Sequence, residues 1–221
     1  MEKIQDKKHQ QVISRKRVAD HGEVYTAPRE VNAMLDLVRQ ETERIDSRFL
    51  EPACGTGNFL TEILKRKLQV VQARYGKSPL EYERYAILAV SSLYGIDILE
   101  DNVMECRRRL FDIFDRRYDS LFKEECRESV TYILERNIIW GDALTLQTVG
   151  ENPQPIVFSE WSPVNSNMIK RRDFTFRELL YNAEIRARPL FSDLGEEVFL
   201  PEPVREYPLV HYLKVADVQQ K

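Results

Sequence analysis

The sequence predicts an α/β fold with a largely parallel sheet, and three observations support this. Short apolar stretches typical of buried strands alternate with amphipathic helical stretches through most of the chain. A turn with two glycines, residues 51–57, joins the first expected strand directly to a helix. Asp97 and Asp142 follow the next two strands. Because parallel sheets bind ligands at the carboxyl ends of their strands, we expect these polar residues to share one edge.

In the first half of the chain, the spacing of apolar residues predicts three helices and two strands. Pro28 in a first turn, with apolar residues recurring from Val31 to Val38, predicts a helix that runs to about residue 44. Asn58 can cap the helix that follows the glycine turn, which is expected to end near Gly76. The other elements predicted here are strands over residues 47–50 and 93–98 and a helix over residues 79–92.

In the second half, an apolar stripe from Val103 to Tyr118 predicts a long helix over residues 100–118, with its arginines on a solvated face. The further elements predicted are helices over residues 124–134 and 174–187 and strands over residues 137–140 and 155–161. Right-handed crossovers would bring the ends of all four strands to one edge. Beyond the last helix only a proline-punctuated tail remains, so the sheet is expected to be shortened at its C-terminal end.

The composition of the chain limits the classes of protein to which it can belong. The chain has 221 residues, of which 43% are hydrophobic, enough for one sizeable core. It has no run of 18 apolar residues, and its start lacks the apolar part of a signal peptide, so a cytoplasmic protein without a membrane segment is expected. A net charge of -3 is not typical of a nucleic-acid binder. Any contact with DNA is therefore expected to come from local patches or from a partner.

The chain contains three cysteines, Cys54, Cys106 and Cys126. Their number is odd, and their spacing does not match that of a metal site such as Cys-x-x-Cys. Neither a disulfide framework nor a metal site is expected.

The stretch from Phe49 to Leu60 is the most informative part of the chain. Gly55 and Gly57 remove side chains where a ligand would lie against backbone, and they permit backbone angles that other residues avoid. The helix that follows would point its free amide groups at the loop, which suits a ligand that carries a carboxylate or phosphate. A purely structural turn is the alternative, since many strand-to-helix turns contain two glycines.

The segment Glu51 to Leu60 resembles motif I of adenine-N6 DNA methyltransferases, especially the modification subunits of type I and related restriction systems. Three more segments are similar to motifs of the same family and stand in the same order: residues 22–28, residues 94–98 and residues 137–144. In the first of these, Ala27 is an insertion. The resemblance covers Gly22 to about Ser162, and it implies a Rossmann-like S-adenosylmethionine-dependent methyltransferase sheet.

The resemblance also implies which residues hold S-adenosylmethionine. Thr26 and Glu51 match positions that help to hold the methionine half, Asp97 matches the acid that binds the ribose hydroxyls, and Asp142 matches the acid beside the adenine amino group. The full set of implied cofactor residues is Thr26, Glu51, Pro52, Cys54, Gly55, Gly57, Asp97, Ile98, Asp142 and Ala143. The plain alternatives are a helix cap for Asp97 and a turn aspartate for Asp142.

The catalytic segment of the family matches only in part. Adenine's exocyclic nitrogen needs acceptors aimed at its hydrogens, and the flipped base needs an aromatic ring to stack on. In the corresponding segment, residues 159–165, only Ser162 and Pro163 match, and they are the catalytic candidates. Val164 replaces the second proline and Asn165 stands where the aromatic residue belongs. Trp161 is either a substitute for that ring or a packing residue.

Taken with the resemblance, the chain is expected to be a subunit of a DNA adenine-N6 methyltransferase, with a separate subunit for DNA recognition and possible assembly into a homo- or hetero-oligomer. The alternative is a catalytically inactive subunit that binds S-adenosylmethionine and serves regulation or assembly. A methyltransferase for small molecules or proteins is a third possibility, because the fold does not determine the acceptor.

Three regions are expected: a polar N-terminal arm (1–21), a methyltransferase-like cofactor-binding domain (22–172), and a helix with a proline-punctuated tail (173–221). The arm is rich in lysine and arginine, and it is either a solvated terminal helix or a DNA-contacting arm. The basic residues 170–172 are either a phosphate-contacting patch or a solvated loop.

Overall fold

The computed structural model describes residues 17, 26–118, 123–165, 167–187 and 201–217. Its helices are α2 (Pro28–Asp36), α3 (Arg39–Thr42), α4 (Asn58–Tyr75), α5 (Pro79–Ser91), α6 (Glu100–Tyr118), α7 (Glu124–Asn137), α8 (Phe176–Ala187) and the 3-10 segment η1 (Tyr212–Asp217). Its strands are β1 (Phe49–Glu51), β2 (Leu93–Asp97), β3 (Ile138–Asp142), β4 (Gln147–Thr148), β5 (Val157–Asn165), β6 (Met168–Thr175), β7 (Arg205–Glu206) and β8 (Val210–His211). The expected α/β class is confirmed. Apart from Arg17, the polar arm lies outside these residues.

The first sheet has the order β1-β2-β3-β4. Its first three strands are parallel, with Phe49 opposite Leu93 and Gly95 opposite Ile138, and β4 returns antiparallel to β3. All five residues of β2 are buried, which explains why this strand appears in the sequence as a continuous apolar run. The carboxyl ends of β1, β2 and β3 therefore meet at one edge, as predicted.

The fourth strand predicted from the sequence, over residues 155–161, belongs to a second sheet. Residues 157–165 form β5, which does not join the parallel sheet but pairs antiparallel with β6. Residues 143–156 contain β4 and turns but no helix, and a parallel return normally needs a crossover of a dozen or more residues, usually a helix. Ile156 packs with Ala143 beside the carboxyl end of β3, whereas Glu160 bonds Arg48, which precedes β1. Strand β5 therefore runs back toward the amino edge, and the prediction of a parallel fourth strand was wrong.

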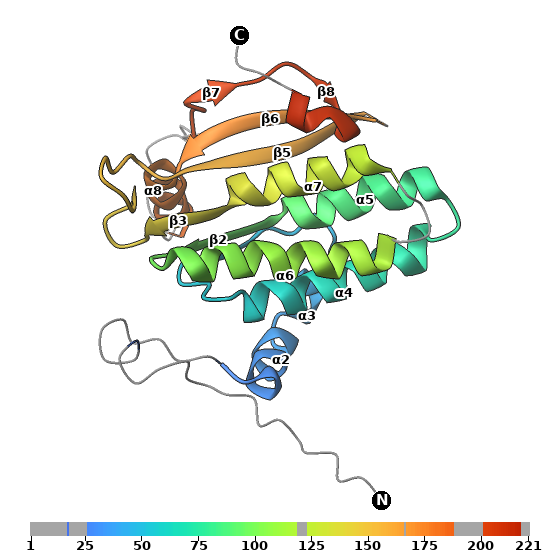
Figure 1. Ribbon diagram of the computed structural model, residues 1–221, viewed down its shortest axis with the longest axis horizontal. Coiled ribbons are helices and arrows are strands. Elements are labelled where there is room, and N and C mark those ends of the chain that lie inside the picture. The colour runs from blue at the N-terminus through green and yellow to red at the C-terminus, as the bar shows by residue number, and fades with distance from the viewer. Residues whose placement is uncertain (1–16, 18–25, 119–122, 166, 188–200, 218–221) are drawn as a thin grey trace, which may run out of the picture.

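Four helices form the main body of the core. Helix α4 packs on α5 and α6, and α7 packs on α5 and α6. Figure 1 shows the β5–β6 hairpin lying along the side of α5 and α7 that faces away from α4 and α6. The largest fully buried side chains include Leu64, Leu68, Leu110, Phe114 and Tyr118, and the apolar stripes of α4 and α6 supply them, as their helical spacing predicts.

The helix predicted over residues 28–44 is two helices. Helix α2 ends at Asp36, where Leu37 and Val38 donate to the carbonyls three residues before them, the tightened bonding typical of a helix end. Leu37 is 86% exposed, so no packing of this side chain holds the helix together at this point.

The basic residues 170–172 lie in strand β6, so the prediction of a solvated loop was wrong. Lys170 pairs with Glu206, Arg171 with Asp173, and Arg172 with Glu160. Glu206 of β7, Glu160 of β5 and Asp173 of β6 itself neutralise the patch, and the predicted boundary between residues 172 and 173 falls inside the strand.

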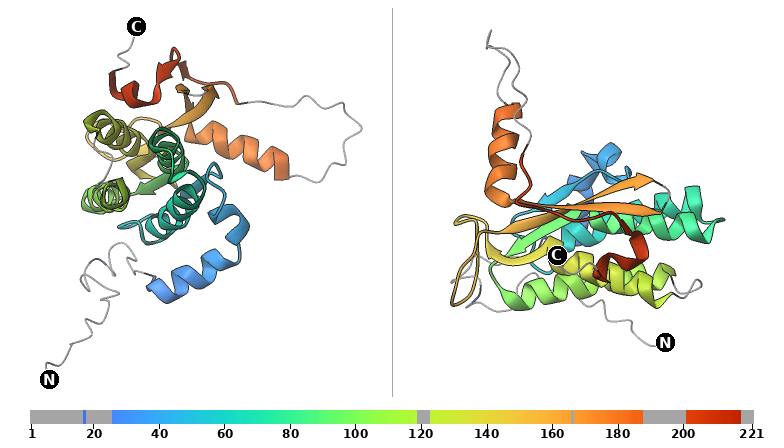
Figure 2. Two further views of the ribbon diagram at one scale, coloured as in Figure 1. Left: turned by 90° about the vertical axis from the view of Figure 1, so that its right-hand side faces the viewer. Right: turned by 90° about the horizontal axis from the view of Figure 1, so that it is seen from above.

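Helix α8 begins at Phe176 rather than at residue 174, because Phe174 and Thr175 belong to β6. Thr175 Oγ1 accepts the Glu178 amide, and the Glu178 carboxylate accepts the Thr175 amide in return, which is a capping box. Figure 2 shows α8 projecting from the end of β6 away from the helical body. Within the described ranges, no helix has the length and apolar character needed to cross a membrane.

Candidate cofactor site

One cavity of about 580 Å³ opens at the carboxyl edge of the parallel sheet, a volume typical of small-molecule sites. Nine of the ten predicted cofactor residues line it: Thr26, Glu51, Pro52, Cys54, Gly55, Asp97, Ile98, Asp142 and Ala143. They come from the segment before α2, the loop after β1, and the ends of β2 and β3. The parallel order of these strands brings together residues that are far apart in the sequence.

The loop after β1 is held by backbone hydrogen bonds. Cys54 donates its amide to Ile96 O at 2.8 Å, and Gly57 donates to Cys54 O at 2.8 Å. Gly55 has φ 52° and donates its amide to Asp97 Oδ2 at 2.8 Å. This left-handed backbone angle is one that glycine adopts without strain.

Gly57 is the tenth predicted cofactor residue, and it does not line the cavity. It has φ 84°, and a Cβ built on it would lie 2.5 Å from Cys106 Sγ of α6. Glycine is therefore required here by the close approach of α6 and by the backbone angle, rather than by the wall of the cavity.

Asp97 receives three hydrogen bonds. Its Oδ1 accepts the Leu99 amide at 2.9 Å and Asn102 Nδ2 at 3.1 Å, and its Oδ2 accepts the Gly55 amide. A carboxylate offers about four acceptor positions, so roughly one remains, on Oδ2. Asp97 can thus accept one ribose hydroxyl without rearrangement, but not both. It is not a helix cap, because Leu99 O receives the first bond of α6.

Glu51 and Asp142 present carboxylate oxygens to the cavity. Within the described part of the chain, Glu51 accepts no hydrogen bond and forms no ion pair, and burial raises its pKa. An unpaired, partly buried carboxylate favours a cationic ligand group. Asp142 Oδ1 accepts the Leu144 amide at 2.8 Å, the bond of a turn aspartate, while its Oδ2 accepts none from the described residues.

The predicted cap of α4 takes another form. Asn58 is the first residue of α4, and Gly57 precedes it without a side-chain cap. Asn58 Nδ2 donates to Thr26 O at 3.1 Å, and its Oδ1 accepts Arg109 Nη1 at 2.9 Å. Asn58 therefore links the segment before α2 to the loop and to α6.

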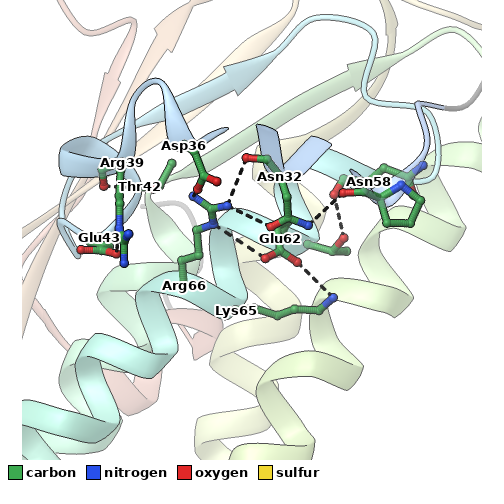
Figure 3. A network of polar contacts seen from close by, with 11 residues as sticks. Asn32, Asp36, Arg39, Thr42, Glu43, Asn58, Glu62, Lys65 and Arg66 are labelled. Atoms are coloured by element: carbon green, nitrogen blue, oxygen red, sulfur yellow. Dashed lines mark hydrogen bonds and ion pairs between the residues drawn. The ribbon is translucent and has the colours of Figure 1, made fainter. Parts of the chain in front are cut away.

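A polar network holds α2 against α4. Arg66 of α4 donates to Asn32 Oδ1 at 2.9 Å and pairs with Asp36 at 2.9 Å, both on α2. Asn32 Nδ2 donates to Pro28 O. Figure 3 shows this network beside Asn58. Since Thr26 lies just before α2, these contacts set its position at the cavity.

The catalytic candidates lie elsewhere. Ser162 and Pro163 line a separate cavity with Arg48 and Ser92, the residues that directly precede β1 and β2. They are therefore at the amino edge of the sheet, opposite the cofactor cavity, and their predicted place at the carboxyl edge was wrong. The reason is the direction of β5. Ser162 Oγ donates to Glu160 Oε1 at 2.8 Å.

Trp161 is a packing residue. It is 4% exposed, and its Nε1 donates to Asn137 Oδ1 at 3.2 Å. Its ring meets Tyr132 edge-on, with 6.2 Å between centroids. The indole is thus fully engaged between α7 and the second sheet.

Comparison with known proteins finds no match. No family model, no curated protein and no solved structure matches the chain. The resemblance to adenine-N6 methyltransferases therefore depends on the motif residues alone. The position of these residues around one cavity is an observation that does not depend on the resemblance.

The three cysteines are not placed as reactive thiols. All three are buried, and Cys106 together with burial raises the pKa of the Cys54 thiol far above its usual range, so this thiol stays protonated. Among the described residues, no group of three or more His, Cys, Asp or Glu side chains is placed to hold a metal ion.

Two residues that position the site were not among the predicted site residues, and the prediction that the arginines of α6 lie on a solvated face was wrong for Arg109. Asn102 is 2% exposed and bonds Asp97, and Arg109 Nη1 donates to Thr56 O at 2.7 Å and to Thr56 Oγ1 at 2.9 Å. Both lie at helical spacing from Cys106 on the buried side of α6. A polar residue on an apolar helix face signals a buried polar partner, and this signal was present in the sequence.

Proposed function

We propose that the chain is an S-adenosylmethionine-binding subunit of a DNA adenine-N6 methyltransferase of the restriction-modification type. The observation that carries the proposal is the convergence of nine motif residues on one cavity at the carboxyl edge of the parallel sheet. The finer assignment of the fold, a Rossmann-like methyltransferase sheet, belongs to the same proposal and is supported by the parallel β1-β2-β3 order.

The groups that line the cavity fit this cofactor. Glu51 offers an unpaired carboxylate for an ammonium group. Gly55 leaves backbone exposed where a side chain would occupy space, and Asp97 keeps about one acceptor position for a ribose hydroxyl. Asp142 keeps one oxygen for an amino group on a purine ring. When bound, S-adenosylmethionine supplies an activated methyl group, and the residues of this chain bind and orient it.

The second candidate is a catalytically inactive subunit with the same cofactor site. It is favoured by the position of Ser162 and Pro163 at the amino edge, and by the engagement of Ser162 Oγ with Glu160. On this reading, methyl transfer requires acceptor groups from another chain.

Calorimetric titration of the purified chain with S-adenosylmethionine tests the part that both candidates share. The unaltered chain is expected to bind, and Glu51→Gln is expected to weaken binding about tenfold through loss of a charge-assisted contact. Glu128→Gln is the matched control, because Glu128 is an exposed carboxylate of α7 outside the cavity. Absence of binding, or equal affinity in both variants, would remove the cofactor assignment.

Tritiated methyl transfer to unmethylated DNA then separates the two candidates. If Ser162 is catalytic, the unaltered chain transfers methyl groups, alone or with a recognition subunit, and Ser162→Ala does not. If the chain is inactive by itself, binding occurs without transfer under both conditions. Transfer that persists in Ser162→Ala would show that other residues perform the catalysis.

A further inference from the structure

A second polar cavity, of about 350 Å³, lies at the amino edge of the parallel sheet. It is bounded by the turn before β1, the end of α4, α5 and β5. Its wall holds three arginines, Arg44, Arg48 and Arg74, against one carboxylate, Asp46. Glu41 and Glu160, outside the wall, also pair with Arg44 and Arg48, so the uncompensated positive charge is that of Arg74, and it favours an anionic ligand.

The three arginines differ in how they are paired. Arg44 pairs with Asp46 at 3.1 Å and with Glu41 at 3.6 Å, and Arg48 pairs with Glu160 at 2.9 Å. Arg74, exposed at the end of α4, forms no hydrogen bond and no ion pair with the described residues. Its guanidinium donors are therefore available, in a planar arrangement that suits phosphate oxygens.

A lysine stands one layer behind this wall. Lys67 is fully buried, and its Nζ donates to Ile45 O, Ser47 O and Ser92 Oγ, with no carboxylate hydrogen-bonded to it. Ile45 and Ser92 belong to the wall of the cavity. Burial lowers the pKa of Lys67 to about 7, so a fraction of molecules carries a buried positive charge near neutral pH. An anion in the cavity would stabilise that charge.

An apolar groove of about 340 Å³ continues from this cavity, and the two share Tyr85, Leu88 and Pro163. The ring of Tyr85 stacks on Tyr75 with 3.8 Å between centroids. Beyond them the groove is lined by apolar side chains that include Ile87, Val164 and Met168, and Val164 is 53% exposed. The groove also contains the polar side chains of Arg84, Asn165 and Asn167, so the combined site is basic at one end and mainly, but not wholly, apolar at the other.

We propose that this amino-edge site binds a phosphorylated small molecule with an apolar body, whose phosphate contacts Arg44, Arg48 and Arg74 and whose apolar part lies along Tyr85 and Val164. The site is separate from the cofactor cavity, since the two are at opposite edges of the sheet and share no residues. Its occupancy therefore does not require S-adenosylmethionine to bind, although the catalytic candidates Ser162 and Pro163 also line it.

Calorimetry with three probes tests the site: inorganic phosphate, octyl phosphate and octanol. Octyl phosphate is expected to bind at least about tenfold more tightly than inorganic phosphate, because its chain buries apolar surface. Arg74→Gln is expected to weaken binding of both phosphates about tenfold, since it removes charge-assisted hydrogen bonds. Val164→Ser is expected to reduce the advantage of octyl phosphate and leave inorganic phosphate unchanged.

Arg116→Gln is the matched control, because Arg116 is an exposed arginine of α6 that lines neither cavity. Arg74 makes no contact that folding requires, so its variant is expected to unfold at the same urea concentration as the control. The proposal is overturned if neither phosphate binds, if the Arg74 and Arg116 variants bind equally, or if octanol binds as tightly as octyl phosphate.

Discussion

Gly57→Ala tests how closely the cofactor loop is held against α6. Gly57 has φ 84°, and a Cβ at this position would lie 2.5 Å from Cys106 Sγ. The left-handed backbone costs about 1–2 kcal/mol for a residue with a side chain, and overpacking a buried contact costs about 1–3 kcal/mol more. We therefore expect the free energy of unfolding to fall by roughly 2–5 kcal/mol, a large part of the total for a typical domain.

Urea denaturation followed by far-ultraviolet circular dichroism measures this loss. Gly150→Ala is the matched control, since Gly150 also has a positive φ, 146°, but nothing lies within 4 Å of its added Cβ. The double variant Gly57→Ala/Cys106→Ala is expected to recover the overpacking part, because the shorter side chain removes the clashing sulfur. If Gly57→Ala lowered the free energy of unfolding as much in the Cys106→Ala background as in the unaltered chain, the argument that α6 requires a glycine here would be refuted.

Three further predictions concern the titratable groups. Asp97→Ala leaves three hydrogen-bond donors without an acceptor, so the free energy of unfolding, measured by urea denaturation, should fall by about 2–4 kcal/mol. Calorimetry should also show weaker binding of S-adenosylmethionine. Unchanged affinity would exclude the ribose contact. Burial raises the pKa of Glu51 above the usual range of a glutamate. Affinity for S-adenosylmethionine should therefore rise as the pH increases through this raised pKa, and Glu51→Gln should abolish the rise. Burial lowers the pKa of Lys67 from 10.5 to about 7 in the folded state. Between these two pH values the unfolded chain binds more protons than the folded chain, so the free energy of unfolding should rise by a few kcal/mol as the pH increases from about 7 to 10.5. Lys67→Met should lose this pH dependence in urea titrations, and an unchanged dependence of stability on pH in the variant would contradict the prediction.

Elements whose apolar residues are buried could be predicted from the sequence. Helix α6 has the predicted bounds, because its apolar stripe from Val103 to Tyr118 faces the core. Helix α5 begins at Pro79, as predicted, and Ser78 Oγ accepts the Glu81 amide. Periodicity succeeds in these cases because burial of apolar surface is what stabilises the element.

Strand β6 could not be predicted in the same way. Arg171 and Asp173 look solvated in the sequence, yet their side chains are 11% and 8% exposed and form a bidentate pair. Tyr207 and Ser159 donate to the same carboxylate. A hydropathy pattern counts each charge as exposed, so it cannot reveal charges that are buried because they pair with each other within one strand and bond side chains of neighbouring segments.

The sequence predicted the position of the candidate cofactor residues correctly but not that of the catalytic segment, because the two depend on different strands. Apart from Thr26, the predicted cavity residues follow strands β1 to β3, and helical crossovers make these strands parallel, so motif order brings these residues together. Ser162 would need a fourth parallel strand, and residues 143–156 provide no crossover helix. The absence of a helical pattern in this connection was visible in the sequence, and it indicates an antiparallel return.

The direction of β5 also decides which experiment on catalysis is most informative. For Ser162 to reach the cofactor cavity, β5 would have to leave β6 and break the contact between Trp161 and Asn137 in the core. That rearrangement would expose Trp161, which is 4% exposed in the structure, together with a long hairpin edge. Acceptor groups supplied by a second chain require no such change. A mixture of this chain with a candidate partner should therefore transfer methyl groups to DNA where this chain alone does not. Glu51→Gln in this chain should reduce that activity, while Ser162→Ala should leave it unchanged. Loss of activity in Ser162→Ala, with S-adenosylmethionine binding intact, would instead show that β5 does rearrange during catalysis.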